Sequence, residues 1–155
     1  MKKITFLILL ITAGYLNSQN GPVDFESGGI GDSWTWTVDQ NDSNPALEIV
    51  DNPKTDGANT SAKVAKFTAK AAGNPWALVI SEDIGSFTFD ENNSIVKLMV
   101  RKDIATDVGV KFEGAGGVAK EVKVANSVTN GDWEELTFDF KEVIGVTYNK
   151  LVIIP

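Results

Sequence analysis

The sequence predicts an all-β domain whose short strands pack as a sandwich or a barrel. After residue 20, almost every apolar run alternates with polar residues at the period of two that strands show. Clusters of Gly, Asn, Asp and Pro separate these runs, and such residues supply the backbone angles that tight turns need. No stretch keeps the 3.6-residue period of an amphipathic helix. Short strands at this spacing are typical of sandwiches and barrels.

The first half of the domain contains four predicted strands. Trp34, Trp36 and Val38 alternate with polar residues, and residues 46–50 form a short run that ends before Asn52 and Pro53. Residues 63–70 alternate less cleanly. Residues 76–81 are continuously apolar, as in a strand that is covered on both faces.

The second half alternates more regularly. Every second residue is Val, Leu or Phe in four successive runs, which places those side chains on one face of each strand and in the core. The runs are 96–101, 108–113, 121–124 and 135–140.

The last apolar run, 151–154, has the composition of a strand in the middle of a sheet. It ends at Pro155 with no polar tail, although chain ends are normally polar and frayed. This pattern predicts that the sequence is a fragment whose closing strand or strands lie beyond residue 155.

Residues 1–20 have the pattern of a secretory signal peptide. Lys2 and Lys3 precede an apolar run from 4 to 16, and a polar stretch follows at 17–20. The run is shorter than the roughly 20 apolar residues of a membrane-spanning helix. Ser18 or Gln19 would be the last residue of the signal peptide. The alternative interpretation of residues 1–20 is a buried N-terminal helix. We therefore expect residues 21–155 to be one domain, either secreted or held at the cell surface or in the periplasm.

Charge and composition exclude several classes of function. The first twenty residues carry two Lys and no acid, so the remainder has 12 basic and 21 acidic side chains and a net charge of −9. This sign disfavours nucleic acids and anionic membranes as partners. The chain has no Cys and no His, which excludes a lipoprotein anchor on Cys, thiolate or imidazole zinc sites and His-dependent nucleophiles.

Carboxylates remain as candidates for acid–base catalysis, but no pair suits it. Glycoside hydrolases need two carboxylates roughly 5–10 Å apart across a cleft. Glu134 and Glu135 are neighbours on one strand and point to opposite faces. Asp39, Asp42 and Asp51 lie in turns or at strand ends. We therefore predict that this chain is not an enzyme.

The four tryptophans are candidates for stacking against an apolar ligand face. Trp76 follows a Gly-Asn-Pro turn, where it would lie at a rim. Trp34 and Trp36 point the same way, and at least one should belong to the core. Trp133 precedes a regular strand and is expected to act as a core or edge plug.

A Gly-rich turn near residue 26 combines carboxylates with free carbonyl groups, which are the hard oxygen ligands that Ca²⁺ prefers. An ordinary strand end with solvated acids is the alternative.

Several short motifs follow one another along the domain: Val23–Glu26, Val50–Pro53, Gly57–Val64, Asn74–Ala77, Val110–Glu113 and Asp132–Phe140. Taken in this order, they resemble a module of secreted proteins of Bacteroidetes, especially marine flavobacteria. The module is similar to carbohydrate-binding modules with the galactose-binding-like jelly roll, and the resemblance covers residues 22–155. Such modules accompany polysaccharide hydrolases and surface glycan-binding proteins.

The resemblance implies a jelly-roll sandwich and one structural calcium ion. By position, Glu26 and the Gly28 carbonyl would be its ligands here. A further ligand in such modules is an Asp in a final strand, and this sequence ends before that strand. Asn59, Trp76, Lys111 and Glu113 match the recurring pattern of the module.

We therefore expect this chain to be a monomeric module of a larger protein that binds a polysaccharide without cleaving it. The first expected ligand is a neutral β-glucan such as laminarin. The candidate ligand-binding residues are Trp76, Trp34, Trp36, Lys111, Glu113, Arg101 and Asn59. The alternatives are a structural spacer or adhesion module without a sugar site, and an accessory domain of a larger enzyme.

Overall fold

The computed structural model describes residues 22–40, 43–55, 57–71 and 76–155. These residues form β-strands and two single-turn 3₁₀ helices, η1 (Ala115–Gly117) and η2 (Lys141–Val143), which confirms the predicted all-β fold. Neither helical turn in the described ranges has the length or hydropathy of a membrane span. The predicted signal peptide lies outside the described residues.

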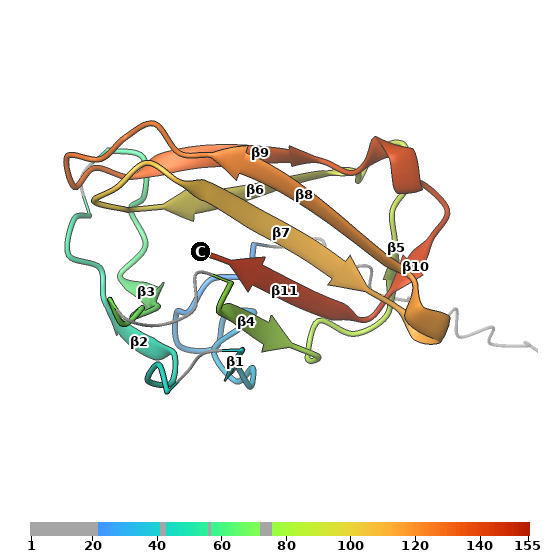
Figure 1. Cartoon of the computed structure of the whole chain (residues 1–155), viewed down its shortest axis with the longest axis horizontal. Helices are drawn as coiled ribbons and strands as arrows, with labels where there is room; N and C mark the ends of the chain where they lie inside the picture. Colours follow the sequence, from blue (N-terminus) through green and yellow to red (C-terminus); the bar gives the residue numbers. More distant parts are fainter. Residues whose placement is uncertain (1–21, 41–42, 56, 72–75) are drawn as a thin grey trace, which may run out of the picture.

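Five antiparallel strands form the main sheet. In spatial order they are β1 (Thr37–Asp39), β4 (Leu78–Ser81), β11 (Lys150–Ile154), β7 (Asp107–Glu113) and β8 (Ala119–Ala125). Figure 1 shows β11, the last strand among the described residues, between β4 and β7. The final apolar run is therefore a mid-sheet strand, as its composition predicted.

Three strand pairs accompany the main sheet. They are β6 (Ile95–Val100) with β9 (Glu134–Asp139), β2 (Glu48–Asp51) with β3 (Lys63–Lys66), and β5 (Phe87–Thr88) with β10 (Thr147–Tyr148). β6 and β9 form a layer above the main sheet in Figure 1. The pair turns Leu136 and Phe138 toward β7, so that two layers enclose one core.

The core contains the apolar faces that the alternation predicted. Val108, Val110 and Phe112 of β7 pack against Phe138 of β9, and each is at most 4% exposed. The rings of Phe89 and Phe140 stack in parallel with centroids 5.0 Å apart. Phe112 meets Phe140 edge to face at 5.1 Å, which is a favoured aromatic geometry. Fully burying each such side chain contributes about 1.5–3 kcal/mol.

Some strand boundaries differ from those expected. The strand predicted over 63–70 ends at Lys66, and the backbone N–H of Lys70 donates instead to the Asn44 side chain. Trp34 and Trp36 precede β1, and the N–H of Trp34 donates to the Gly31 carbonyl, which closes a turn. The pattern did not predict β5 and β10, which are two residues long and have no period to recognise.

Candidate functional site

Three loops meet at the end of the sandwich where β7 begins. They connect β2 to β3, β6 to β7 and β8 to β9, and lie at the left of Figure 1. Asn126, only 3% exposed, joins two of them. Its Oδ1 accepts from the N–H of Thr106 at 3.0 Å, and its Nδ2 donates to the carbonyls of Ile104 and Val128, both at 3.2 Å.

Trp133 attaches the third loop. Its Nε1 donates to Asn52 Oδ1 at 3.1 Å and to the Lys54 carbonyl at 2.9 Å. Asn52 is itself buried, and its Nδ2 donates to the carbonyls of Asn59 and Ser61. The partly buried indole therefore connects the β8–β9 loop to the β2–β3 loop, and its hydrogen bonds hold the β2–β3 loop in place.

An open hollow of about 350 Å³ lies where these loops meet. Its lining residues, which define the loop-end pocket, are Lys54, Gly57, Ala58, Asp132 and Trp133. This volume lies within the range of small-molecule sites in proteins.

Charged groups of both signs surround the loop-end pocket. Lys54 Nζ forms an ion pair with Asp132 Oδ1. Hydrogen bonds from Lys54 and from the Asn130 side chain lower the pKa of the Asp132 carboxyl, and the charge of Lys54 and, to a smaller extent, that of nearby Arg101 lower it further. Arg101 is exposed and directs its Nε to the Gly131 carbonyl at 2.7 Å. Two cations thus flank one carboxylate beside an indole ring.

Two of the predicted ligand-binding residues belong to this end. Arg101 lies beside the pocket through its contact with Gly131. Asn59 is in the β2–β3 loop, where its Oδ1 accepts from the N–H of Ser61 at 3.2 Å and from the Ser61 hydroxyl at 2.7 Å. Its side-chain oxygen thus helps to shape the loop.

Lys111 and Glu113 lie on the main sheet, on the face opposite the core. Lys111 Nζ and Glu113 Oε1 are 2.5 Å apart. Lys150 of the neighbouring strand lies 3.7 Å from Glu113 and 2.9 Å from Glu82. The hydrogen bond from Lys111, with a smaller contribution from Lys150, lowers the pKa of Glu113. These side chains form a half-buried ion-pair network away from the loop-end pocket.

Trp76 is 55% exposed, in agreement with its predicted position at a rim. It precedes β4 by two residues. In the antiparallel register, Leu78 lies opposite Asp39, the last residue of β1, and Val79 lies opposite Ile153 near the end of β11. Trp76 is therefore near the end of the main sheet from which the β6–β7 loop also emerges.

Trp34 and Trp36 pack against the core instead of forming an exposed platform. Their ring centroids are 5.8 Å apart, and Phe25 lies 6.0 Å from Trp36. Trp36 Nε1 is buried and has no hydrogen-bond partner among the described residues. These contacts agree with the expectation that at least one of the two belongs to the core.

The carboxylate of Glu26, a predicted calcium ligand, accepts hydrogen bonds from the backbone. Its Oε1 accepts from the backbone N–H groups of Ala62 and Lys63, where β3 begins. The N–H of Gly28 donates to Asp32 at 3.0 Å, which closes the turn that carries the Gly28 carbonyl. Within the described ranges, no three His, Cys, Asp or Glu side chains come together as metal ligands.

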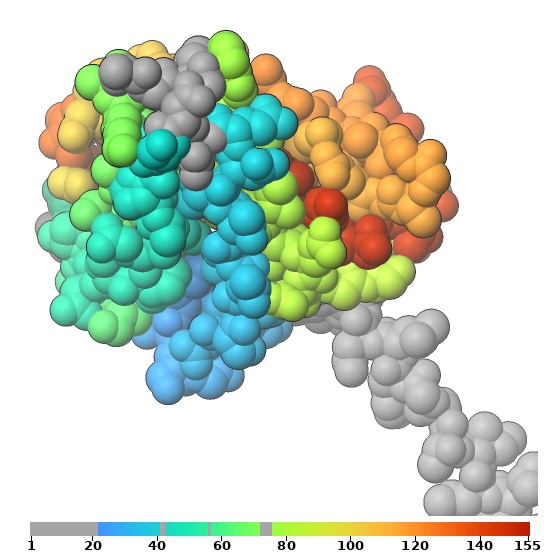
Figure 2. Space-filling view, turned by 60° about the horizontal axis from the view of Figure 1, so that its bottom comes forward, coloured from blue at the N-terminus to red at the C-terminus, as the bar shows by residue number. Residues whose placement is uncertain are grey.

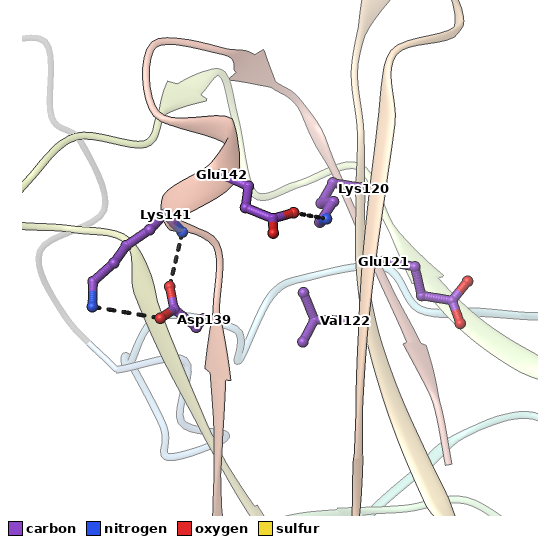
Figure 3. A pocket seen from close by; sticks show the side chains of 6 residues that line it. All are labelled: Lys120, Glu121, Val122, Asp139, Lys141 and Glu142. Carbon is purple, nitrogen blue, oxygen red and sulfur yellow. Dashed lines mark hydrogen bonds and ion pairs between the residues drawn. The ribbon is translucent and has the colours of Figure 1, made fainter.

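A second hollow, of about 360 Å³, lies between β8 and β9 (Figure 3). Its lining residues are Lys120, Glu121, Val122, Asp139, Lys141 and Glu142. Lys120 pairs with Glu142 at 2.7 Å, and Lys141 pairs with Asp139 at 3.4 Å. This lining contains no aromatic ring, whereas the lining of the loop-end pocket includes the indole of Trp133.

Sequence reasoning did not assign Lys54, Asp132 or Trp133 to a site. Lys54 and Asp132 are 78 residues apart, and no local pattern predicts their contact. A usable signal was the Asn130-Gly131-Asp132 turn directly before Trp133, which places a carboxylate and an indole at one loop end.

Searches against models of known protein families and against curated protein sequences found no match to this chain.

Proposed function

We propose that this chain binds a polysaccharide without cleaving it, and that the sugar contacts the loop-end pocket. The observation that carries the proposal is the convergence of Trp133 with Lys54, Asp132 and Arg101. A sugar ring offers an apolar C–H face to an indole, while its hydroxyl groups need donors and acceptors at the ring edge. The pocket supplies both.

The first ligand to test is a neutral β-glucan such as laminarin. A net charge of −9 after residue 20 opposes strongly anionic chains, and the ion-paired groups of the pocket offer both donors and acceptors to hydroxyl groups. Affinity at one such site should be on the order of millimolar to micromolar, because a single sugar face buries little area. In this proposal the chain is a secreted, monomeric jelly-roll module that targets a parent protein or a partner hydrolase to its substrate and holds one structural Ca²⁺.

A spacer or adhesion module without a sugar site is the second candidate. The internal partners of the pocket favour it, because Lys54 pairs with Asp132 and the Trp133 N–H is already bonded to the β2–β3 loop. Such contacts are also what a purely structural loop end would show.

Affinity electrophoresis on gels containing laminarin, alginate, agarose or xylan separates the two candidates. The polysaccharide-binding proposal expects retardation on at least one gel, and Arg101→Gln should reduce it severalfold by removing a charged donor from the rim. Lys97→Met is the matched control, since Lys97 is an exposed cation with an ordinary ion pair to Glu135 on β9. If the folded wild-type protein is not retarded on any gel, the spacer function is favoured.

Two further variants locate the site. Trp76→Ala and Lys111→Met change residues outside the lining of the loop-end pocket, Trp76 directly before β4 and Lys111 on β7. Loss of retardation in one of these variants but not in Arg101→Gln would place the sugar at that residue instead.

A further inference from the structure

The Asn130–Gly131 peptide bond lies at the rim of the loop-end pocket, directly before Asp132. It forms a bend between β8 and β9, and Asn130 is exposed. Asn130 Oδ1 accepts a hydrogen bond from the N–H of Asp132 at 3.2 Å, which folds the side-chain amide back over the backbone of Gly131. A bond between Asn130 Cγ and the peptide nitrogen of Gly131 would close a five-membered ring, so the covalent chain itself keeps these two atoms within reach of each other.

The nitrogen of Gly131 is available as a nucleophile. Its N–H makes no hydrogen bond to any residue that the structure describes. Gly131 has no Cβ to hinder the approach, and its φ of 83° is an angle that glycine adopts without strain. Holding two reacting groups close together removes much of the entropic barrier to their reaction.

We propose that Asn130 is a site of spontaneous deamidation, and that its isoaspartyl product disrupts the loop-end pocket. The nitrogen of Gly131 attacks Asn130 Cγ and loses its proton, while the bond from Cγ to Nδ2 breaks and ammonia leaves. The product is a five-membered succinimide. Solvent water then opens either carbonyl of the ring, which gives aspartate or, through the other carbonyl, isoaspartate. Nothing is oxidised or reduced.

The isoaspartyl product changes the geometry of the rim. It adds one methylene to the backbone between residues 130 and 131, directly before two groups that define the site. One is the Gly131 carbonyl, which accepts from Arg101, and the other is Asp132, which pairs with Lys54. A displacement of both groups separates the charged groups from the Trp133 ring. The effect on sugar binding rests on the proposed function, whereas the deamidation itself does not.

Asn92 provides an internal comparison. It is also exposed and lies in a turn, but the next residue is Asn93, whose N–H donates to the Asp90 carbonyl at 3.2 Å. The nucleophile at this turn is thus both hydrogen bonded and shielded by a side chain. Asn92 should therefore react far more slowly than Asn130.

The test is incubation of the full chain in mildly alkaline buffer, followed by trypsin digestion and mass spectrometry. Cleavage after Lys resolves residues 124–141, which contain Asn130, from residues 71–97, which contain Asn92. We expect aspartate and isoaspartate to accumulate in the first peptide at least tenfold faster than in the second. Equal rates at the two sites would overturn the proposal.

The consequence for the pocket has its own measurement. Fractions of aged protein separated by charge should show about tenfold weaker retardation on the polysaccharide gel when isoaspartate is present, as expected for the loss of a charged hydrogen bond. In Asn130→Gln, the peptide of residues 124–141 should keep its mass and the protein should keep its retardation through the same incubation. Aged wild-type protein that is retarded as strongly as fresh protein would refute the effect on the pocket. If fresh protein is not retarded at all, the proposed function fails while the rates still test the deamidation.

Discussion

Asn126 should be the most sensitive polar residue at the loop end. It is 3% exposed and makes three hydrogen bonds to the backbone of two loops. Asn126→Asp preserves the shape and keeps one acceptor for the N–H of Thr106. It replaces the Nδ2 donor with an oxygen that faces the carbonyls of Ile104 and Val128.

The cost follows from these contacts. Two donated hydrogen bonds are lost, each with a net contribution of about 0.5–1.5 kcal/mol, and the carbonyls of Ile104 and Val128 then lack this donor. The new oxygen also places a buried charge without a partner, or else the carboxyl takes up a proton. We expect the free energy of unfolding to fall by roughly 3 kcal/mol. For a domain of this size, the melting temperature should fall by about 10 °C.

Urea denaturation followed by tryptophan fluorescence, together with calorimetry, measures both quantities. Asn92→Asp makes the same chemical change at an exposed turn and should stay within about 0.5 kcal/mol of wild type. If Asn126→Asp were as mild as this control, our account of how the loops are held together would be incorrect.

Three further predictions concern pH, the start of β3 and calcium. Interactions in the folded state lower the pKa of Glu113 and Glu134 below the ordinary value of 4.5. The stability that these ionised carboxylates contribute is therefore present above pH 4.5 and is lost as the pH falls through their folded-state pKa. Urea titrations should accordingly show lower stability below about pH 4.5 and a flat profile from about pH 6 to 8, since the chain has no His. Glu26→Gln should lower stability by about 1 kcal/mol, because a neutral amide oxygen accepts more weakly from the N–H groups of Ala62 and Lys63, and a shift in the urea midpoint measures this. Chelator should lower the melting temperature if calcium is bound as proposed, and an unchanged value would count against the ion.

Alternation along the strands was enough to predict most of the core. Val108, Val110 and Phe112 repeat every second residue and all face inward, and the same holds for Leu136 and Phe138. These strands are long enough for a period of two to be visible. Tyr148 is fully buried yet was not predicted, because it belongs to the two-residue strand β10.

The composition of the pocket could not be predicted in the same way. Which loops share an end of a sandwich depends on strand order and register, and these are set by contacts between distant residues. Of the four polar residues predicted to bind one ligand, Arg101 and Asn59 lie at the loop end. Lys111 and Glu113 instead form an ion pair on the main sheet. Lys54 and Asp132, which flank the pocket, have no sequence pattern that marks them as partners.

The place of β11 in the main sheet has a consequence for the order of folding. The hairpin of β7 and β8 is local and can form early, but β4 reaches β7 only through β11. Val152 lies opposite both Ile80 and Lys111, so these two residues have no shared partner until the final strand inserts. As the chain is synthesised from its N-terminus, the two halves of the sheet should therefore remain unjoined until residues 150–154 become available. Such a long-range closure predicts slow, cooperative assembly of the main sheet.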